Sequence, residues 1–302
     1  MGAKIIVSIL MLLVLILFIS PCLASNNAKN AMLQMTTTLE NSETQPQWNF
    51  AENIGDGRGI TFGCIGFCTG TDDGNILIKY YTKLNPDNTL AKYIPALDKI
   101  DSGSNDAGVG NPSTAGLNGF IKDVQNCNDP LFKQAQLYEL NRMYYNPAVK
   151  MYNSIGAKNA LTLAFIYDMC VRHGSDGAQE IIESAGTSPK QSADENDYLS
   201  KLISLRDVKL KSEGLDDVDR DAGYKKLLIS RNVNLKTPFT FVAYGDKFTI
   251  HGNLGIDTGD VASNERKVPS ASFNAKPTDG KVPLKVQFTV PLQKISAKDI
   301  IK

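Results

Sequence analysis

A glycine-rich segment between residues 53 and 74 carries the side chains with the clearest chemical potential. Its seven glycines separate acidic, basic and hydroxyl groups, namely Asp56, Arg58, Thr61, Asp72 and Asp73. So many glycines indicate a backbone that adopts positive φ, or approaches other backbone closely, in several places. Because binding residues concentrate on loops that a rigid framework holds, we interpret the segment as a functional site rather than as a solvated hairpin.

Two common motifs do not fit this segment. The Gly-Asp-Gly-Arg-Gly sequence lacks the spacing of a dinucleotide fingerprint and opens no clear helix, which argues against a Rossmann phosphate loop. The Asp-Asp-Gly sequence lacks the alternating ligands of a calcium loop. An acidic group on a shaped loop then needs a chemical partner elsewhere in the chain.

The best candidate partner is Glu40, upstream of Asp56. It ends a segment whose apolar residues recur at helical spacing, which predicts that it lies at the end of a helix. A carboxylate on a helix end that faces another on a glycine-rich hairpin is the layout of a lysozyme-type glycoside hydrolase. The apolar residues that define the helix are Met32, Leu33, Met35 and Leu39.

Three stretches around these carboxylates carry a specific pattern: residues 39–42 (Leu-Glu-Asn-Ser), 52–61 (Glu-Asn-Ile-Gly-Asp-Gly-Arg-Gly-Ile-Thr) and 66–71 (Gly-Phe-Cys-Thr-Gly-Thr). Together they resemble the N-terminal signature of the family 46 chitosanases. The resemblance covers about residues 28–251. Further matching stretches are 90–97, 134–136, Arg142 with 144–149, 172–174 and 243–246.

The resemblance implies an endo-acting, inverting hydrolase of chitosan, a β-1,4-linked glucosamine chain, that needs no cofactor. It makes Glu40 the general acid and Asp56 the base that activates water, with Thr61 positioning that water. It also suggests substrate contacts. These are Asn41, Arg58, Asp73, which is able to pair with a sugar ammonium, and His173. We interpret His173 as a residue that lines the cleft wall or is packed, rather than as a base.

The same resemblance matches Asp168, Arg206 and Arg220 to an Asp-Arg-Arg chain that leads to the catalytic glutamate. An arginine beside a general acid favours the ionised carboxylate, which is the wrong protonation state for an acid. We therefore expect the arginine charge to be shared with Asp168 and the chain to orient Glu40. A purely structural ion pair is an equally good interpretation of Asp168, which lies in an apolar helix.

Metal binding is not expected. Asp217, Asp219 and Asp221 alternate as in a calcium loop, but Gly223 falls one position late and no Glu closes the loop. The cysteines are not paired at Cys-x-x-Cys spacing and the chain has two histidines, which argues against zinc.

Four cysteines follow the N-terminal apolar run: Cys64, Cys68, Cys127 and Cys170. Four cysteines allow three disulfide pairings, and the sequence does not choose among them. Cys68 lies in the matched signature and Cys170 in an apolar helix, so we expect both to be buried thiols.

Length and charge restrict the class of protein. The chain has 302 residues, enough for one or two domains, with 32 basic and 32 acidic residues. This balance gives no indication of nucleic-acid binding or of an anionic membrane partner. Residues 1–24 resemble a signal peptide cleaved after Ala24, so we expect a secreted, extracellular protein that is free of the membrane after cleavage, and a monomer.

The remaining pattern is mostly helical. One helix is predicted from 131 to 145 and is stopped by Asn146-Pro147, and another from 159 to 171 is predicted to be the buried central helix. Two more helices are predicted from 194 to 211 and from 219 to 230. A hairpin is predicted at residues 239–250. These elements indicate an α+β, mainly α, lysozyme-like fold with two lobes, a substrate cleft and a small β-hairpin region.

The predicted domains are the signal peptide (1–24), a chitosanase-like catalytic domain (25–255), a linker (256–267) and a partial PKD-like segment (268–302) that is too short to bury a core of its own. Two other functions fit the residues. One is a lysozyme-like hydrolase of another amino-sugar polymer. The other is a non-catalytic polysaccharide-binding surface protein.

Overall fold

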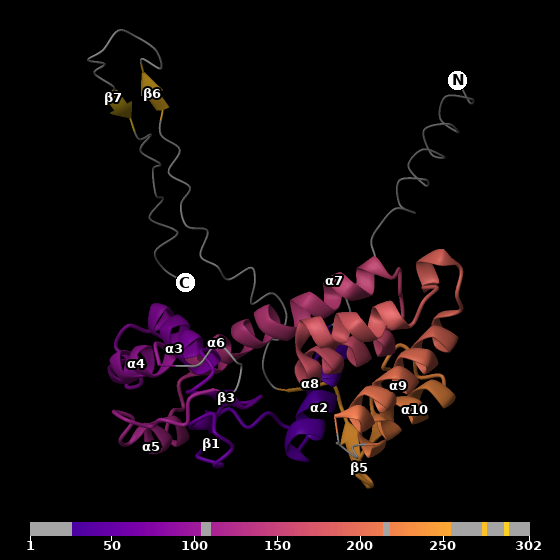
Figure 1. Cartoon of the computed structure of the whole chain (residues 1–302), viewed down its shortest axis with the longest axis horizontal. Coiled ribbons are helices and arrows are strands. Elements are labelled where there is room, and N and C mark those ends of the chain that lie inside the picture. The colour runs from indigo at the N-terminus through magenta and orange to yellow at the C-terminus, as the bar shows by residue number, and fades with distance from the viewer. Residues whose placement is uncertain (1–25, 104–109, 214–217, 255–273, 277–286, 290–302) are drawn as a thin grey trace, which may run out of the picture. The chain divides into compact units, whose positions relative to one another are not determined.

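The computed structural model describes residues 26–103, 110–213, 218–254, 274–276 and 287–289. Helices dominate this part of the chain and the strands are short (Figure 1). This confirms the predicted α+β, mainly α fold. The elements up to residue 254 fall into two groups, which correspond to the two predicted lobes.

The first group surrounds a small antiparallel sheet of order β1-β2-β3. Its core contains Phe62 and Phe120, whose rings meet edge to face at 5.0 Å between centroids. Phe67 adds a third buried ring, 6.2 Å from that of Phe62. The elements are β1 (Ala51–Glu52), β2 (Thr61–Phe62), β3 (Phe67–Cys68), α3 (Asp73–Leu84), η1 (Ala91–Tyr93), α4 (Ile94–Asp101) and α5 (Phe120–Gln125).

The second group packs around α8 (Ala160–Ser184), whose first half is buried on every side, as predicted for the central helix. Gly174 has non-helical backbone angles and bends α8 just after the predicted end of this helix. The predicted helix at 194–211 is confirmed as α9 with Asp194 as its N-cap. The other elements are α7 (Asn146–Ser154), η3 (Pro189–Gln191), α9 (Glu195–Ser212), η4 (Val218–Asp221), α10 (Ala222–Ile229), β4 (Phe239–Ala243) and β5 (Asp246–Ile250).

Two helical segments join the groups. The N-terminal helix α2 (Asn26–Asn41) contacts α8 and the β4–β5 hairpin and carries the catalytic candidate Glu40 in its last turn. The helix α6 (Pro130–Leu140) packs on α3 and continues through the π-helical segment η2 (Asn141–Tyr145) into α7.

The prediction that Asn146-Pro147 stops the helix is therefore wrong. The Asn146 N–H bonds to the Asn141 carbonyl, five residues back, so the chain makes one wide π turn before Pro147. A proline normally breaks a helix because it lacks an N–H and its ring clashes with the carbonyl four residues earlier. The wider turn relieves that clash and lets the helix continue.

The cysteine predictions are confirmed for Cys68 and Cys170, which are buried thiols. Cys64 and Cys127 are also buried and free, so none of the three possible pairings forms among these four residues.

The tail contributes one described pair of strands, β6 (Asn274–Lys276) and β7 (Gln287–Thr289), which are antiparallel. The predicted signal peptide, the linker and the rest of the predicted PKD-like segment lie outside the described residues. Within the described ranges, no helix is both long and apolar enough to span a membrane.

Gly70 fastens the glycine-rich segment to the loop after residue 110. Its N–H bonds to the Arg58 carbonyl at 3.0 Å, and its carbonyl accepts from the Asn111 N–H at 2.8 Å. A Cβ at this position would overlap the carbonyl oxygen of Asn111, and backbone cannot move aside as a flexible side chain can.

We expect Gly70→Ala to lower the free energy of unfolding by about 1–3 kcal/mol, the usual effect of overpacking. Denaturant unfolding measures this. Gly103→Ala is the control, because a Cβ there meets its nearest atom, the Asn111 side-chain nitrogen, at 3.3 Å. Equal stability of the two variants would contradict the predicted clash.

Candidate active site

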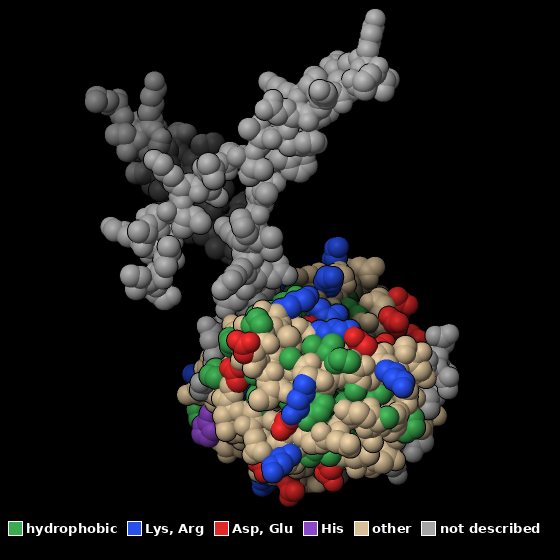
Figure 2. Space-filling model, turned by 90° about the vertical axis from the view of Figure 1, so that its left-hand side faces the viewer, with side chains coloured by type: hydrophobic (Ala, Val, Ile, Leu, Met, Phe, Trp, Pro, Cys, Tyr) green, Lys and Arg blue, Asp and Glu red, His purple; other side chains and the backbone are tan. Residues whose placement is uncertain are grey.

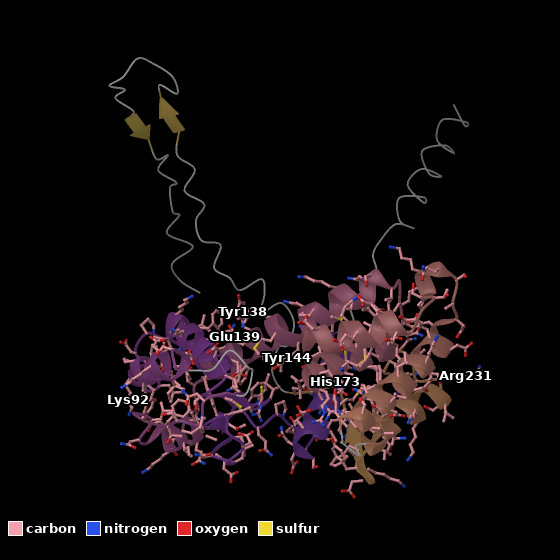
Figure 3. The ribbon with its side chains drawn as sticks, in the orientation of Figure 1. Lys92, Tyr138, Glu139, Tyr144, His173 and Arg231 are labelled. Atoms are coloured by element: carbon pink, nitrogen blue, oxygen red, sulfur yellow. The ribbon has the colours of Figure 1, made fainter. Side chains whose placement is uncertain are left out.

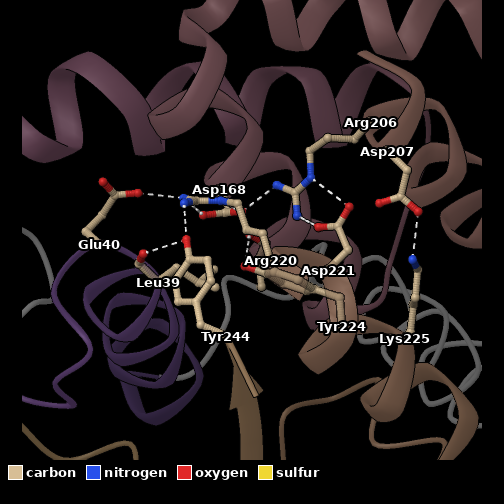
Figure 4. Close-up of polar contacts among 11 residues, drawn as sticks. Leu39, Glu40, Asp168, Arg206, Asp207, Arg220, Asp221, Tyr224, Lys225 and Tyr244 are labelled. Atoms are coloured by element: carbon tan, nitrogen blue, oxygen red, sulfur yellow. Dashed lines mark hydrogen bonds and ion pairs between the residues drawn. The ribbon is translucent and has the colours of Figure 1, made fainter. Parts of the chain in front are cut away.

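Glu40 lies at the last turn of α2 with its carboxylate partly exposed, 29% of the side chain. One of its oxygens, Oε1, is 2.6 Å from Nη2 of Arg220 (Figure 4). Arg220 comes from η4 and is 180 residues from Glu40 in the sequence. This contact therefore links the end of α2 to the second group of elements.

Behind Glu40 lies a buried network of two arginines and two aspartates. Arg220 bonds to both carboxylate oxygens of Asp168, at 2.7 Å from Nη2 and 3.2 Å from Nε. Arg206 pairs with the same Asp168 and, on its other side, with Asp221. Two positive and two negative charges balance, so Glu40 does not face an uncompensated cation.

The arginines determine the protonation of this network. Burial by itself would raise the pKa of Asp168, but the charges of Arg220 and Arg206 hold it below its ordinary value. Burial opposes the charge of Arg220 in turn, but the carboxylates of Asp168 and Glu40 raise the pKa of Arg220 above its usual range. Asp168 is therefore ionised beside a charged Arg220. Burial lowers the pKa of Arg206, but a guanidinium keeps its proton inside proteins.

Aromatic rings complete the environment of Arg206. Its guanidinium carbon lies 4.1 Å from the ring centroid of Phe165 and 5.5 Å from that of Tyr224. Cation–π contacts of this kind stabilise a guanidinium that water does not reach.

Asp56 lies on the hairpin between β1 and β2 and is paired with Arg58. The guanidinium contacts Asp56 Oδ2 at 2.6 and 2.8 Å, and the Arg58 N–H donates to Asp56 Oδ1 at 3.1 Å. Partial burial favours the neutral carboxyl, but these contacts outweigh it and lower the pKa of Asp56. An exposed carboxylate that stays ionised is suited to act as a base.

Asp73 begins α3, and its carboxylate has a different environment. Oδ1 accepts hydrogen bonds from the Thr71 hydroxyl and from the N–H groups of Cys68 and Gly74, at 2.8 to 3.1 Å. Burial outweighs these donors and raises the pKa of Asp73 to about 6. Among the described residues, the hydrogen bonds of Asp73 all end on Oδ1 and none uses Oδ2.

Thr61 and Tyr144 border this region. Thr61 is buried in β2, with its hydroxyl 3.5 Å from the Cys68 sulfur. Tyr144 comes from the π segment η2 (Figure 3). Burial raises its pKa to about 12, and the nearby carboxylates of Asp73 and Glu40 add to this shift. Tyr144 thus lies within electrostatic range of both the α2 side and the α3 side of the site.

His173 on α8 is largely enclosed and faces the end of α9. Its side chain is 3% exposed, and Nδ1 faces Glu213 near the end of α9, 3.7 Å away. Burial lowers the pKa of His173 to about 4, so the ring is neutral at ordinary pH. So enclosed a ring fits the packed alternative, and a substrate contact at His173 stays a prediction. Asn41, by contrast, is exposed beside Glu40.

Comparison with known proteins agrees with this geometry. A model of glycosyl hydrolase family 46 matches residues 34–239. The chain belongs to this family. The predicted membership is thus confirmed for the central part of the sequence, whereas the family 46 match ends before residues 268–302 and gives no support to a PKD-like tail.

The alignments with two chitosanases span most of the length of each relative. A chitosanase of Nocardioides sp. (strain N106) is 37% identical over 236 residues, 74% of this chain and 81% of the relative. A chitosanase of Streptomyces sp. (strain N174) is 34% identical over 235 residues, 74% of this chain and 82% of the relative.

Solved chitosanase structures show the same fold. The native chitosanase of Bacillus subtilis MY002 has 31% identity and a TM-score of 0.65, over 75% of this chain and 99% of that one. A chitosanase of Gynuella sunshinyii in complex with chitotetraose has 27% identity and a TM-score of 0.65, over 74% and 97%.

One member of the buried network, Asp221, and one residue that contacts it, Tyr244, were not expected from the sequence. Asp221 was considered only as part of a metal loop, yet it is the second partner of Arg206. Tyr244 was noted only within a matched stretch, yet its hydroxyl contacts Arg220 at 3.2 Å. The family resemblance of residues 243–246 was the available signal for Tyr244; Asp221 had none beyond its place next to Arg220.

We expect Asp168→Asn to destabilise the protein by about 3–5 kcal/mol, because it removes one partner from a buried ion network. Urea unfolding at neutral pH measures the change. Glu180→Gln is the control: it breaks the exposed pair with Lys209, where 68% of the Glu180 side chain is exposed, and exposed pairs contribute at most about 1 kcal/mol.

The pH dependence has a defined sign. The pKa of Asp168 is lower in the folded chain than its ordinary 3.8, so its stabilising contribution is present above that value and is lost as the pH falls below it. Asp168→Asn should remove this part of the acid destabilisation. A variant as stable as Glu180→Gln would show that the buried network does not depend on the Asp168 charge.

Proposed function

We propose that this family 46 hydrolase is a secreted, endo-acting chitosanase that cleaves β-1,4 bonds between glucosamine residues with inversion. The observation that carries the mechanism is the placement of two carboxylates in contrasting environments. Glu40 is held by a charge-balanced network at the end of a helix, and Asp56 is kept ionised on a glycine-rich hairpin. The family and its chitosanase relatives support the substrate.

In the proposed reaction, Glu40 donates a proton to the glycosidic oxygen as the bond to the sugar breaks. Asp56 removes a proton from a water molecule that attacks the opposite face of the same sugar, and Thr61 helps to position this water. Arg58 has two effects on the base. Its side chain lowers the pKa of Asp56, and its backbone N–H donates a hydrogen bond that fixes Oδ1 of Asp56. The configuration at the anomeric carbon is inverted, because water displaces the leaving group in a single step from the opposite face.

Asp73 is the proposed contact for a glucosamine ammonium. Basic and acidic side chains are interspersed on the face shown in Figure 2, so attraction for a cationic chain has to come from individual carboxylates. Two of the similar solved structures are chitosanases complexed with chitotetraose and with 6 GlcN, which supports a glucosamine ligand. Asn41 and Arg58 are further proposed contacts.

We also propose the domain division inferred from the sequence: a signal peptide (1–24), a catalytic domain (25–255), a linker (256–267) and a PKD-like segment (268–302). Secretion follows from the first of these, and the PKD-like assignment rests on sequence resemblance. The protein is expected to act as a monomer without a cofactor.

Asp73→Asn should raise KM for chitosan about tenfold, because it removes the charge from a hydrogen bond to an ammonium group. The KM of the unmodified protein should rise with added salt and as the pH falls through about 6, where Asp73 becomes protonated. The variant should lack most of both effects.

Asp197→Asn, an exposed residue of the first turn of α9, makes the same change in net charge and should behave like the unmodified protein. Equal affinity for chitin and chitosan oligomers in dilute buffer would contradict the ammonium contact and would favour another amino-sugar polymer as substrate.

Asp56→Ala should leave the melting temperature and substrate binding nearly unchanged while it lowers kcat by ~10² or more. Added azide, which needs no deprotonation, should enter the space and restore part of the rate. Because it attacks the face opposite the β-linked leaving group, the product should be an α-glycosyl azide, identified by NMR.

Glu52→Ala is the control, since it removes an exposed carboxylate from the neighbouring strand β1. A β-glycosyl azide would indicate double displacement and a retaining site. Full activity of Asp56→Ala without azide would mean that Asp56 only shapes the hairpin.

A further inference from the structure

Tyr244 occupies an unusual position at the tip of the β4–β5 hairpin. The two turn residues Tyr244 and Gly245 both have positive φ, +52° and +87°. Tight hairpin turns of this kind favour asparagine or aspartate before glycine, because a side chain with a Cβ is disfavoured in the left-handed region. A bulky aromatic residue here suggests that its side chain does something that a better turn residue would not.

The hydroxyl of Tyr244 joins two segments that are distant in sequence. It donates a hydrogen bond to the Leu39 carbonyl at 3.0 Å, and it accepts one from Nη1 of Arg220 at 3.2 Å (Figure 4). Leu39 directly precedes Glu40 in the last turn of α2, where helix carbonyls have no intrahelical partner. One oxygen atom thus satisfies a free carbonyl of α2 and holds an arm of the arginine that binds Glu40.

Glu40 is restrained at both ends through this hydroxyl. Its backbone is held through the adjacent Leu39 carbonyl, and its carboxylate is held through Arg220, whose Nη2 lies 2.6 Å from Oε1. Arg220 uses its other two nitrogens as well, with Nε on Asp168 and Nη1 on Tyr244. Without the Nη1 contact to Tyr244, the Arg220 guanidinium would keep its bonds to Asp168 and Glu40 but would have no partner on the Nη1 side to fix its orientation.

We infer that Tyr244 is a positioning residue for the general acid, which aims the Glu40 carboxyl at the glycosidic oxygen through Leu39 and Arg220. This inference rests on the proposed role of Glu40. Tyr244 is 40% exposed, and both hydrogen bonds of its hydroxyl are part-buried rather than fully buried. The fold should therefore survive the loss of the hydroxyl, while the alignment of the acid should not.

The test is Tyr244→Phe, which keeps the ring and removes the hydroxyl. On a glucosamine hexamer we expect kcat to fall about tenfold or more with KM changed less than about twofold, because small misalignments of a reacting group lower the rate steeply. Tyr198→Phe is the matched control. It removes a buried hydroxyl that donates to the Ile182 carbonyl at 3.4 Å, and kcat should stay within about twofold of the unmodified protein.

A second substrate separates positioning from a structural role. In the 2,4-dinitrophenyl β-glycoside of a glucosamine oligomer the leaving group departs without protonation, so correct alignment of the acid matters little. The kcat deficit of Tyr244→Phe should largely disappear on this substrate. The melting temperature of each variant is recorded alongside.

Three results would overturn the inference: a kcat of Tyr244→Phe within about twofold of the unmodified value on the hexamer, an equal fall in Tyr198→Phe, or the same deficit on both substrates. Failure of the unmodified protein to cleave the hexamer would instead contradict the proposed function, and the role of Tyr244 with it.

Discussion

The buried guanidinium groups of Arg206 and Arg220 impose the strongest constraint on this structure. An arginine keeps its proton inside a protein, so each buried guanidinium has to meet carboxylates and hydrogen-bond acceptors. Asp168 on α8 and Asp221 at the end of η4 supply the buried charges. Satisfying both arginines brings α8, α9 and η4 together, and the remaining side of Arg220 then determines where Glu40 at the end of α2 is held.

The glycine-rich segment depends on a second constraint, close approach of backbone. A Cβ on Gly63 would meet the side chain of Gln136 at 2.7 Å, and that glutamine accepts from the Cys64 N–H and donates to the Trp48 carbonyl. Gln136 therefore fastens both ends of the hairpin that carries Asp56 to α6. The proposed base, Asp56, is placed by the first group of elements and the proposed acid, Glu40, is held by the second, so their relative position depends on how the two groups pack.

Two aspartates of the same segment show how environment separates chemical roles. Asp56 is exposed and paired with Arg58, so its pKa is lowered and it stays ionised. Asp73 is more enclosed, which raises its pKa to about 6. The same side chain thus acts as a permanent anion at one position and as a group that titrates near neutrality at the other. A lowered pKa suits the base in water activation, while a half-buried carboxylate suits recognition of a cationic sugar.

The sequence by itself determined the features that depend on near neighbours or on a family pattern. A run that is apolar nearly all round located the central helix, the polar start at Asp194 located α9, and alternation over residues 239–250 located the hairpin. The conspicuous stretches around Glu40 and Asp56 were enough to identify the family.

Only the tertiary structure decided which charges meet. Glu40 and Arg220 are 180 residues apart, and Arg220 and Asp168 are 52 apart, so no local spacing predicts these contacts. The same holds for Asp221, which looked like part of a metal loop, and for His173, which packs against Glu213. The π turn before Pro147 likewise arises within a packed helix rather than from the proline signal. Local patterns record what a residue does with its neighbours along the chain, whereas the pairing of buried charges depends on the complete packing of the helices that carry them.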